Sequence, residues 1–306
     1  MPARTAPTPA LRPAPSSPSG VRRATAHGLR SLALALGFAA LSACGDSRAS
    51  AGLSEVEART AVDRLVVLFR PVDPVATSDV HDRNFRERTA ALESLRTGGT
   101  AAGREALARF ERAQGEPFDV RWALLETAAY NAPELAQPTL ERLIQVYEGK
   151  GEEMRTQAVR IAAETIPQRA IELFEPMLRE PLARQTRPPQ EELVRGWQTA
   201  AKKLGLKEAR VLCDLVVDLR QPPDARYAAV NALAEIGGER AIRALREVLV
   251  ESASDGNIRR KSAQALLRIM PRDAFCALIR EASEHEADEM FLFFLADMLD
   301  KNCGAQ

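Results

Sequence analysis

Histidine and aromatic residues are scarce in this sequence, and their scarcity argues against several kinds of fold and site. The 306 residues include only 3 His, 10 Phe, 3 Tyr and 2 Trp. So few aromatic residues give little to an all-β fold, whereas the abundance of Ala, Leu, Arg and Glu favours helices. Zinc sites generally need several His or Cys ligands. We therefore interpret His285, which lies among Glu281, Glu284, Glu286 and Asp288, as part of a solvated acidic helix end.

The common catalytic motifs are also missing. The sequence has no Gly-x-Ser-x-Gly elbow, no Walker A loop and no dinucleotide-binding fingerprint. The pair Gly98-Gly99 falls between two expected helices rather than after a strand, so it predicts a turn and not a phosphate-binding loop. We expect no enzymatic activity, no catalytic residues, no metal and no cofactor.

Positive charge is concentrated at the N-terminus. Residues 1–43 contain five Arg and no acidic residue. The remainder has 37 basic and 42 acidic residues, a net charge of about −5. Binding to nucleic-acid phosphates needs clustered positive charge. A mildly acidic chain therefore argues against a nucleic-acid partner.

Residues 1–43 have the layout of a secretory signal. Arg22, Arg23 and Arg30 precede an apolar run, residues 31–40, which is too short to span a membrane as a stop-transfer helix. The run ends in Leu-Ser-Ala-Cys at residues 41–44, which resembles the bacterial lipobox. The resemblance implies cleavage after Ala43 and acylation of Cys44, and so an exported protein anchored in the cell membrane or the outer membrane. Translation starts at Met1 or, alternatively, at Val21.

A short tether and one helix are expected before the main fold. Residues 46–52 are short, small and polar, and residues 44–53 are interpreted as the lipidated tether. Ser54 and Glu57 form a capping-box pattern that predicts a helix to about Phe69. Pro71 and Pro74 end it, so residues 54–83 are interpreted as an N-terminal helix and linker.

From residue 84 to 302 the sequence repeats. The clearest part is 224–270, where Asp224-Ala225-Arg226 is echoed 33 residues later by Asn257-Ile258-Arg259. An apolar or small residue followed by Arg recurs at spacings of 35, 34, 40, 31 and 33 residues. A helix breaker and a second amphipathic helix follow each occurrence. The recurring arginines are Arg86, Arg121, Arg155, Arg195, Arg226 and Arg259.

This pattern predicts an all-α fold, an α-solenoid of about six helical hairpins closed by a terminal helix over residues 290–299. The units resemble HEAT repeats, and 224–270 is most similar to the HEAT-like repeats of the phycobilisome-lyase family. The resemblance rests on Arg226, Ala229, Ala232, Leu233, Ile236, Gly237, Ala241 and Leu245. It implies the fold and not lyase chemistry, because unrelated binding proteins share this repeat.

The recurring arginines have two interpretations. They could form a basic stripe for an acidic partner, or they could bind carbonyls or an acid of the neighbouring unit. We favour the structural interpretation, because an Arg in the first turn of a helix opposes the helix dipole and needs another partner.

Three cysteines besides Cys44 raise the question of disulfides. Cys213 and Cys276 lie two units apart, too far to pair, whereas Cys276 and Cys303 lie in adjacent elements. Whether these last two pair or remain buried thiols is open from the sequence.

The surfaces that depart from the repeat are candidates for binding. The insertion at 181–190 is either a contact loop or a tolerated one. In the last helix, either Phe291, Phe294, Leu295 and Met298 are buried while Phe293 meets a partner, or the C-terminal segment folds over it. We also expect the second helices to line the concave side, where the exposed residues would be Arg243, Arg246 and Glu247.

Together these features predict a membrane-anchored, non-catalytic HEAT-repeat scaffold that binds another protein in the bacterial cell envelope. One alternative is a lyase- or chaperone-like protein that holds a chromophore or small ligand in the concave groove. Another is a purely structural envelope component joined through its last helix.

Overall fold

The computed structural model describes residues 52–71, 78–145, 152–179, 190–251 and 253–304. The signal segment, Cys44 and most of the 181–190 insertion lie outside these residues. All of the described residues belong to one compact unit. Its described part contains 14 helices and no strand: α1 (Glu55–Phe69), α2 (Ser78–Arg96), α3 (Gly99–Arg112), α4 (Phe118–Asn131), α5 (Pro133–Gln145), α6 (Glu152–Thr165), α7 (Pro167–Arg179), α8 (Gln190–Leu204), α9 (Arg210–Val217), α10 (Pro223–Ile236), α11 (Glu239–Val250), α12 (Gly256–Ile269), α13 (Arg272–Glu284) and α14 (Glu289–Cys303).

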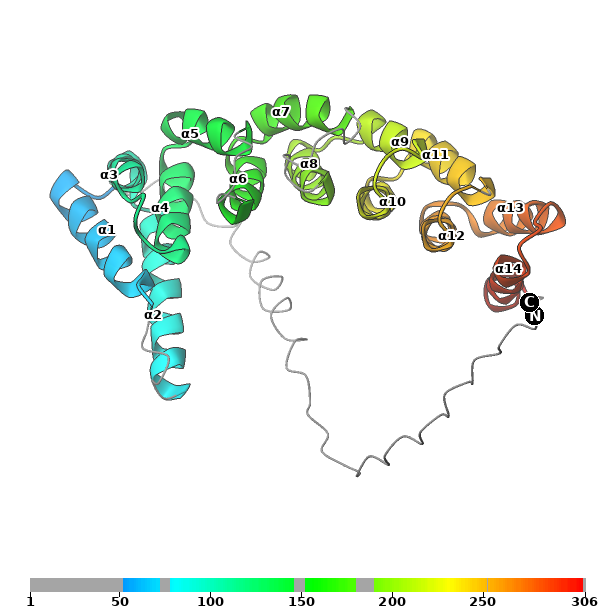
Figure 1. Cartoon of the computed structure of the whole chain (residues 1–306), viewed down its shortest axis with the longest axis horizontal. Helices are drawn as coiled ribbons and strands as arrows, with labels where there is room; N and C mark the ends of the chain where they lie inside the picture. Colours follow the sequence, from blue (N-terminus) through cyan, green and yellow to red (C-terminus); the bar gives the residue numbers. More distant parts are fainter. Residues whose placement is uncertain (1–51, 72–77, 146–151, 180–189, 252, 305–306) are drawn as a thin grey trace, which may run out of the picture. The chain divides into compact units, whose positions relative to one another are not determined.

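The helices form two rows, so the predicted α-solenoid is confirmed. Figure 1 shows the odd-numbered helices in one row, here called the outer row, and the even-numbered helices in the other, the inner row. Each odd helix packs closely on the even helix that follows it, whereas an even helix packs less on its odd successor. The described helices therefore pair as seven hairpins, α1–α2 through α13–α14.

This pairing shifts the expected hairpins by one helix. The sequence pattern groups each Arg-bearing helix with the helix after it, whereas the packing groups it with the helix before it. The helix at 54–69 is consequently the outer helix of the first hairpin. Helix α2 already begins at Ser78, inside the stretch expected to be a linker.

Local sequence explains where the helices begin and end. The side chain of Ser54 accepts a hydrogen bond from the Glu57 amide, and the Glu57 carboxylate accepts one from the Ser54 amide, so the expected capping box is present. Asp255 caps α12 in a similar way, accepting from the amides of Asn257 and Ile258. Gly237 and Gly238, with φ of 71° and 90°, make the turn between α10 and α11.

A continuous apolar core runs between the two rows. Its members are mostly Ala, Leu, Val and Ile, with a few large side chains such as Trp197, Phe174 and Phe275. Small residues let helices of neighbouring hairpins approach closely: a Cβ on Gly196 of α8 would lie 2.7 Å from Val159 Cγ1 of α6. No helix among the described residues is both long and apolar enough to cross a membrane.

Candidate interaction surface

Two of the recurring arginines bind the end of the preceding outer helix. Arg226 on α10 donates from Nε to the carbonyl oxygen of Val216, 2.9 Å away, and Arg259 on α12 donates to that of Leu249 at 2.9 Å. Val216 and Leu249 are the penultimate residues of α9 and α11. A cation at a helix C-terminus complements the helix dipole and satisfies a carbonyl that has no partner within the helix. These contacts hold the hairpins α9–α10 and α11–α12 together.

The same two arginines also reach forward to the next hairpin. Arg226 donates to the hydroxyl of Ser254 at 2.8 Å, and Arg259 forms an ion pair with Glu286. Burial lowers the pKa of Arg226. Burial of Glu286 acts to raise the pKa of that carboxyl, but its hydrogen bonds, chiefly with Arg259, hold the pKa below its ordinary value. Glu286, which the sequence placed in an acidic cluster around His285, is thus a structural partner of Arg259.

In the first hairpin this contact belongs to a different arginine from the one that the repeat spacing selects. Arg88 donates from Nε to the carbonyl oxygen of Leu68, the penultimate residue of α1, at 2.7 Å. Arg86 is exposed and, among the described residues, bonds only to the Asp82 carbonyl within its own helix.

The remaining three recurring arginines do not share one environment. Arg121 lies over the ring of Phe110, with its guanidinium carbon 5.5 Å from the ring centroid, and Arg155 is buried. Arg195 is exposed and pairs with Glu192 on its own helix at 2.9 Å. The recurring arginines therefore do not form a uniform basic stripe.

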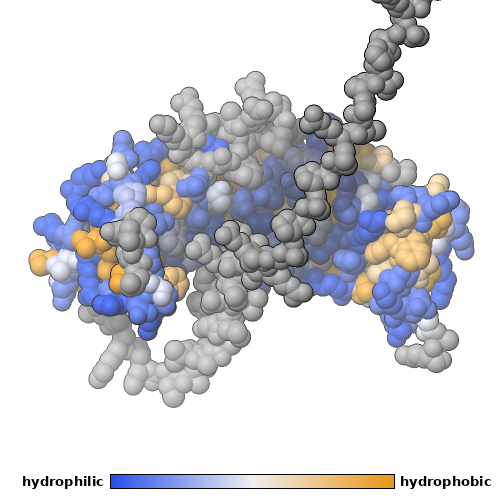
Figure 2. All heavy atoms as spheres, turned by 60° about the horizontal axis from the view of Figure 1, so that its bottom comes forward, coloured by the Kyte–Doolittle hydropathy of each residue, from blue (hydrophilic) through white to orange (hydrophobic). Residues whose placement is uncertain are grey.

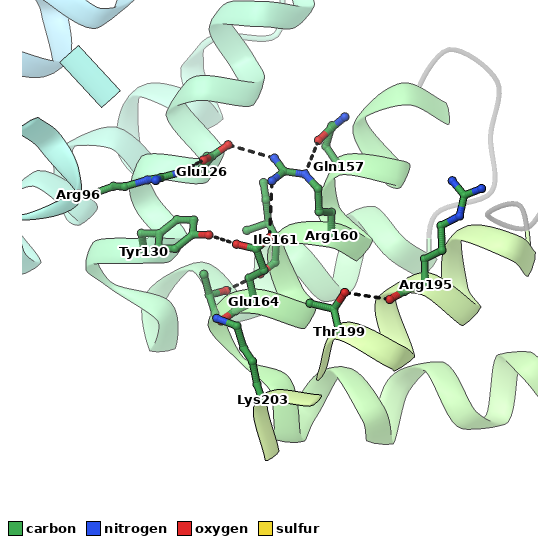
Figure 3. A network of polar contacts seen from close by, with 11 residues as sticks. Arg96, Glu126, Tyr130, Gln157, Arg160, Ile161, Glu164, Arg195, Thr199 and Lys203 are labelled. Atoms are coloured by element: carbon green, nitrogen blue, oxygen red, sulfur yellow. Dashed lines mark hydrogen bonds and ion pairs between the residues drawn. The ribbon is translucent and has the colours of Figure 1, made fainter. Parts of the chain in front are cut away.

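Figure 3 shows a polar network on the inner-row helices α2, α4, α6 and α8. At its centre is Glu126, whose side chain is only 4% exposed. One carboxylate oxygen lies 2.9 Å from Arg96 and the other 3.1 Å from Arg160, and both arginines are about two-fifths exposed. Arg160 also bonds to Gln157 at 3.0 Å. A buried carboxylate thus holds two surface guanidinium groups in fixed positions.

Aromatic and acidic side chains extend this network. The guanidinium of Arg96 lies over the Tyr130 ring, 4.9 Å from its centroid. The Tyr130 hydroxyl donates to Glu164, and Lys203 on α8 donates to the Glu164 carbonyl at 2.8 Å. Burial, opposed by the nearby Lys203 charge and reinforced by that of Glu126, raises the pKa of the Glu164 carboxyl.

Sequence reasoning did not find this network. One signal for it was present: Glu126 interrupts the run Val120–Ala129, in which nearly every other residue is apolar or small. A lone carboxylate on a buried helical run needs a cationic partner. The partners come from helices 30 and 34 residues away, at distances along the chain that the repeat sets.

The sequence predicted that the concave side includes Arg243, Arg246 and Glu247, but the structure places these residues in the outer row. They are exposed on α11, which belongs to the outer row. Arg246 and Glu247 border a cavity of about 280 Å³ between α11 and α13, together with His285. No cluster of His, Cys, Asp or Glu suited to hold a metal occurs among the described residues.

The last hairpin is closed by a disulfide. Cys276 on α13 and Cys303 on α14 are bonded, with their Cα atoms 5.8 Å apart, and Cys213 is a buried free thiol. Phe291, Leu295 and Met298 are buried and Phe294 is partly buried, whereas Phe293 is 75% exposed. The terminal helix therefore buries the residues expected to seal it and leaves Phe293 accessible.

Comparisons with known proteins bear on the fold. A structure described as human deoxyhypusine hydroxylase in complex with glycerol is 18% identical to this chain, covers 81% of it and 98% of itself, and has a TM-score of 0.32, too low to support an argument. None of the curated proteins compared with the chain matches it. Residues 209–290 match the family of HEAT repeats. That match confirms HEAT-like repeats in the part of the chain where the sequence pattern is clearest.

Proposed function

We propose that this protein is a lipid-anchored, non-catalytic scaffold of the bacterial cell envelope that binds a protein partner through the inner face of α2–α8. The observation that carries the proposal is the network centred on Glu126. Arg, Tyr and Trp are the residues that most often dominate protein–protein binding energy. Arg96, Tyr130 and Arg160 are part of this surface, and Arg160 also lies over the Trp122 ring, 5.9 Å from its centroid.

The network supports binding because its side chains are ordered before a partner arrives. Ordering a long side chain at an interface costs about 0.5–1.5 kcal/mol. Glu126 already fixes Arg96 and Arg160 from beneath, and Tyr130 stacks on one of them. Half-exposed guanidinium groups held in this way suit carboxylate groups of a partner protein.

Two features support the location. The Leu-Ser-Ala-Cys segment at 41–44 matches the lipobox pattern, and two or more acyl chains on Cys44 would anchor the protein stably. The Cys276–Cys303 disulfide fits an oxidising compartment, which an exported protein reaches.

Photo-crosslinking in native membranes tests the partner surface. A photoreactive residue replacing Arg195 on the inner row should capture one defined protein, and the same residue replacing Arg243 on the outer row serves as the matched control. Adding Glu126→Gln should abolish the capture, because Arg96 and Arg160 lose the charge that orders them. Equal capture from Arg243, or capture that survives Glu126→Gln, would contradict the proposed surface.

The anchor is tested separately. Cells given a clickable fatty acid should label the native protein and not a Cys44→Ser variant, and labelling of both would refute acylation at Cys44.

The ligand-holding alternative predicts a small molecule that copurifies, visible by native mass spectrometry. The cavity of about 550 Å³ between α10 and α12 is lined in part by charged side chains, which include Asp224, Asp255, Arg260 and Lys261. Small-molecule sites are mostly apolar, so this cavity does not favour the alternative.

A further inference from the structure

The described array begins with an outer helix and ends with an inner helix, so both of its ends are complete hairpins. Figure 1 places α1–α2 at one end and α13–α14 at the other. A further hairpin stacked on α14 would have to begin with an outer helix, as α1–α2 does. We propose that the protein self-associates head to tail, with the α13–α14 end of one copy stacking on the α1–α2 end of the next.

The C-terminal end exposes apolar surface where another hairpin would pack. Phe293 lies two residues after buried Phe291, so its side chain points about 200° around the helix from the core. It is 75% exposed, and Met290 is 68% exposed. Figure 2 shows the resulting hydrophobic patch at this end of the array, at the right of the view. A terminal repeat that caps a solenoid normally has a polar outer surface.

The N-terminal end offers a matching groove. A cavity of about 550 Å³ lies between α1 and α2, with lining residues that include Val56, Thr60, Ala61, Ala90 and Ala91. Such small side chains leave room for a large one, such as Phe293 of a second copy. Val56 is 76% exposed, and Val67, on the same side of α1, is 67% exposed.

Both ends carry charged side chains. Arg64 lines the groove together with Glu57 and Glu87, and among the described residues Arg64 forms no ion pair. Asp300 lies two turns after Phe293 on the same side of α14 and likewise has no ion pair within the described part. An ion pair between Arg64 of one copy and Asp300 of the next would join unlike ends.

This geometry makes the contact heterologous, because the surface used on one copy differs from the surface used on its neighbour. A heterologous contact that does not close into a ring produces an open chain of molecules. The acyl anchor, which confines copies to one membrane surface, would raise the chance of such encounters.

A photo-crosslinker at Phe293 in the full-length, membrane-anchored protein tests this contact. The expected product is a ladder of covalent multimers whose crosslinked peptides come from residues 55–69 and 78–96. Crosslinks to α14 of a second copy would show a symmetric dimer, and crosslinks to lipid or to another protein would show a different occupant. Each of these results, or no crosslink, would overturn the proposal.

Charge reversal provides the matched test. Arg64→Glu and Asp300→Arg should each reduce the ladder at least several-fold, and the double variant in one chain should restore it. Coexpression of the two single variants should also restore multimers, because the carboxylate introduced at position 64 of one chain then meets the guanidinium introduced at position 300 of the other. Both positions are exposed, so circular dichroism should report an unchanged fold. Retention of the ladder in the single variants, or no restoration in the double variant, would exclude this pairing.

Discussion

Nε of Arg226 lies 2.9 Å from the carbonyl oxygen of Val216, ten residues earlier in the chain, and Arg259 makes the same contact with Leu249. The two contacts repeat at the same helical position, one residue before the end of the outer helix. They explain why Arg occurs at the start of these helices, where the helix dipole disfavours a cation.

Replacement of Arg226 by Ala should therefore destabilise the fold. The change removes charge-assisted hydrogen bonds to Val216 and Ser254 and leaves the Val216 carbonyl without its partner, a loss of about 2–3 kcal/mol. Urea unfolding followed by circular dichroism measures it. Arg195→Ala is the matched control and should cost less than about 0.5 kcal/mol, because that side chain is exposed. If the two substitutions lowered the free energy of unfolding equally, the structural role of Arg226 would be contradicted.

The turn between α10 and α11 should tolerate no side chain at Gly238. Its φ of 90° and ψ of 161° lie in a region that only glycine adopts readily, so Gly238→Ala should cost about 1–3 kcal/mol. Gly256, the first residue of α12, has no positive φ, and a Cβ added there would meet nothing within 4 Å. Gly256→Ala should stabilise the protein by up to about 1 kcal/mol in the same assay. A neutral Gly238→Ala would mean that the turn adopts another conformation.

The three cysteines of the helical array should differ sharply in reactivity. Burial raises the pKa of the Cys213 thiol to about 11, so at pH 8 only about one thousandth is thiolate. In the native protein, Cys213 should therefore react slowly with iodoacetamide. Of these three, only Cys213 should be labelled in denatured, non-reduced protein, and Cys276 and Cys303 should be labelled as well after reduction. Mass spectrometry counts the labels, and labelling of Cys276 without reductant would contradict the disulfide.

Stability should depend on the ionisation of Glu164. Its pKa is raised in the folded protein, so as pH rises above the ordinary value of 4.5 the unfolded chain loses its proton first. Deprotonation then favours unfolding. The stability that the protonated carboxyl contributes is therefore lost as the pH rises through the raised pKa of the folded protein. The free energy of unfolding of the native protein minus that of Glu164→Gln should fall across this range. A pH-independent difference would show that Glu164 has an ordinary pKa.

The sequence predicted the class of fold because the period of the repeat is visible in single residues. It did not determine where each hairpin starts, because a helix–turn–helix repeat can be divided in two phases that share one period. Only the packing shows that α9 pairs with α10 and α11 with α12. The repeat spacing selected Arg86, whereas Arg88 makes the contact. The position of the Leu68 carbonyl decides which arginine binds it, and the spacing of the repeat does not reveal that position.

The Glu126 network shows a different limit. Each partner of Glu126 lies on a neighbouring hairpin, so the contact depends on how the hairpins stack. Nothing in the local sequence around Arg96 or Arg160 distinguishes these arginines from exposed ones. The pairing of Cys276 with Cys303, which the sequence left open, follows from the packing of α13 on α14.

The contacts of Arg226 with Val216 and of Arg259 with Leu249 also bear on the order of folding. Each of these two contacts joins residues ten apart, within one hairpin, so it closes a very short loop. Contacts that are close in sequence form quickly. A chain synthesised from its N-terminus can therefore complete one hairpin after another, and the Cys276–Cys303 disulfide, in the last described hairpin, forms last.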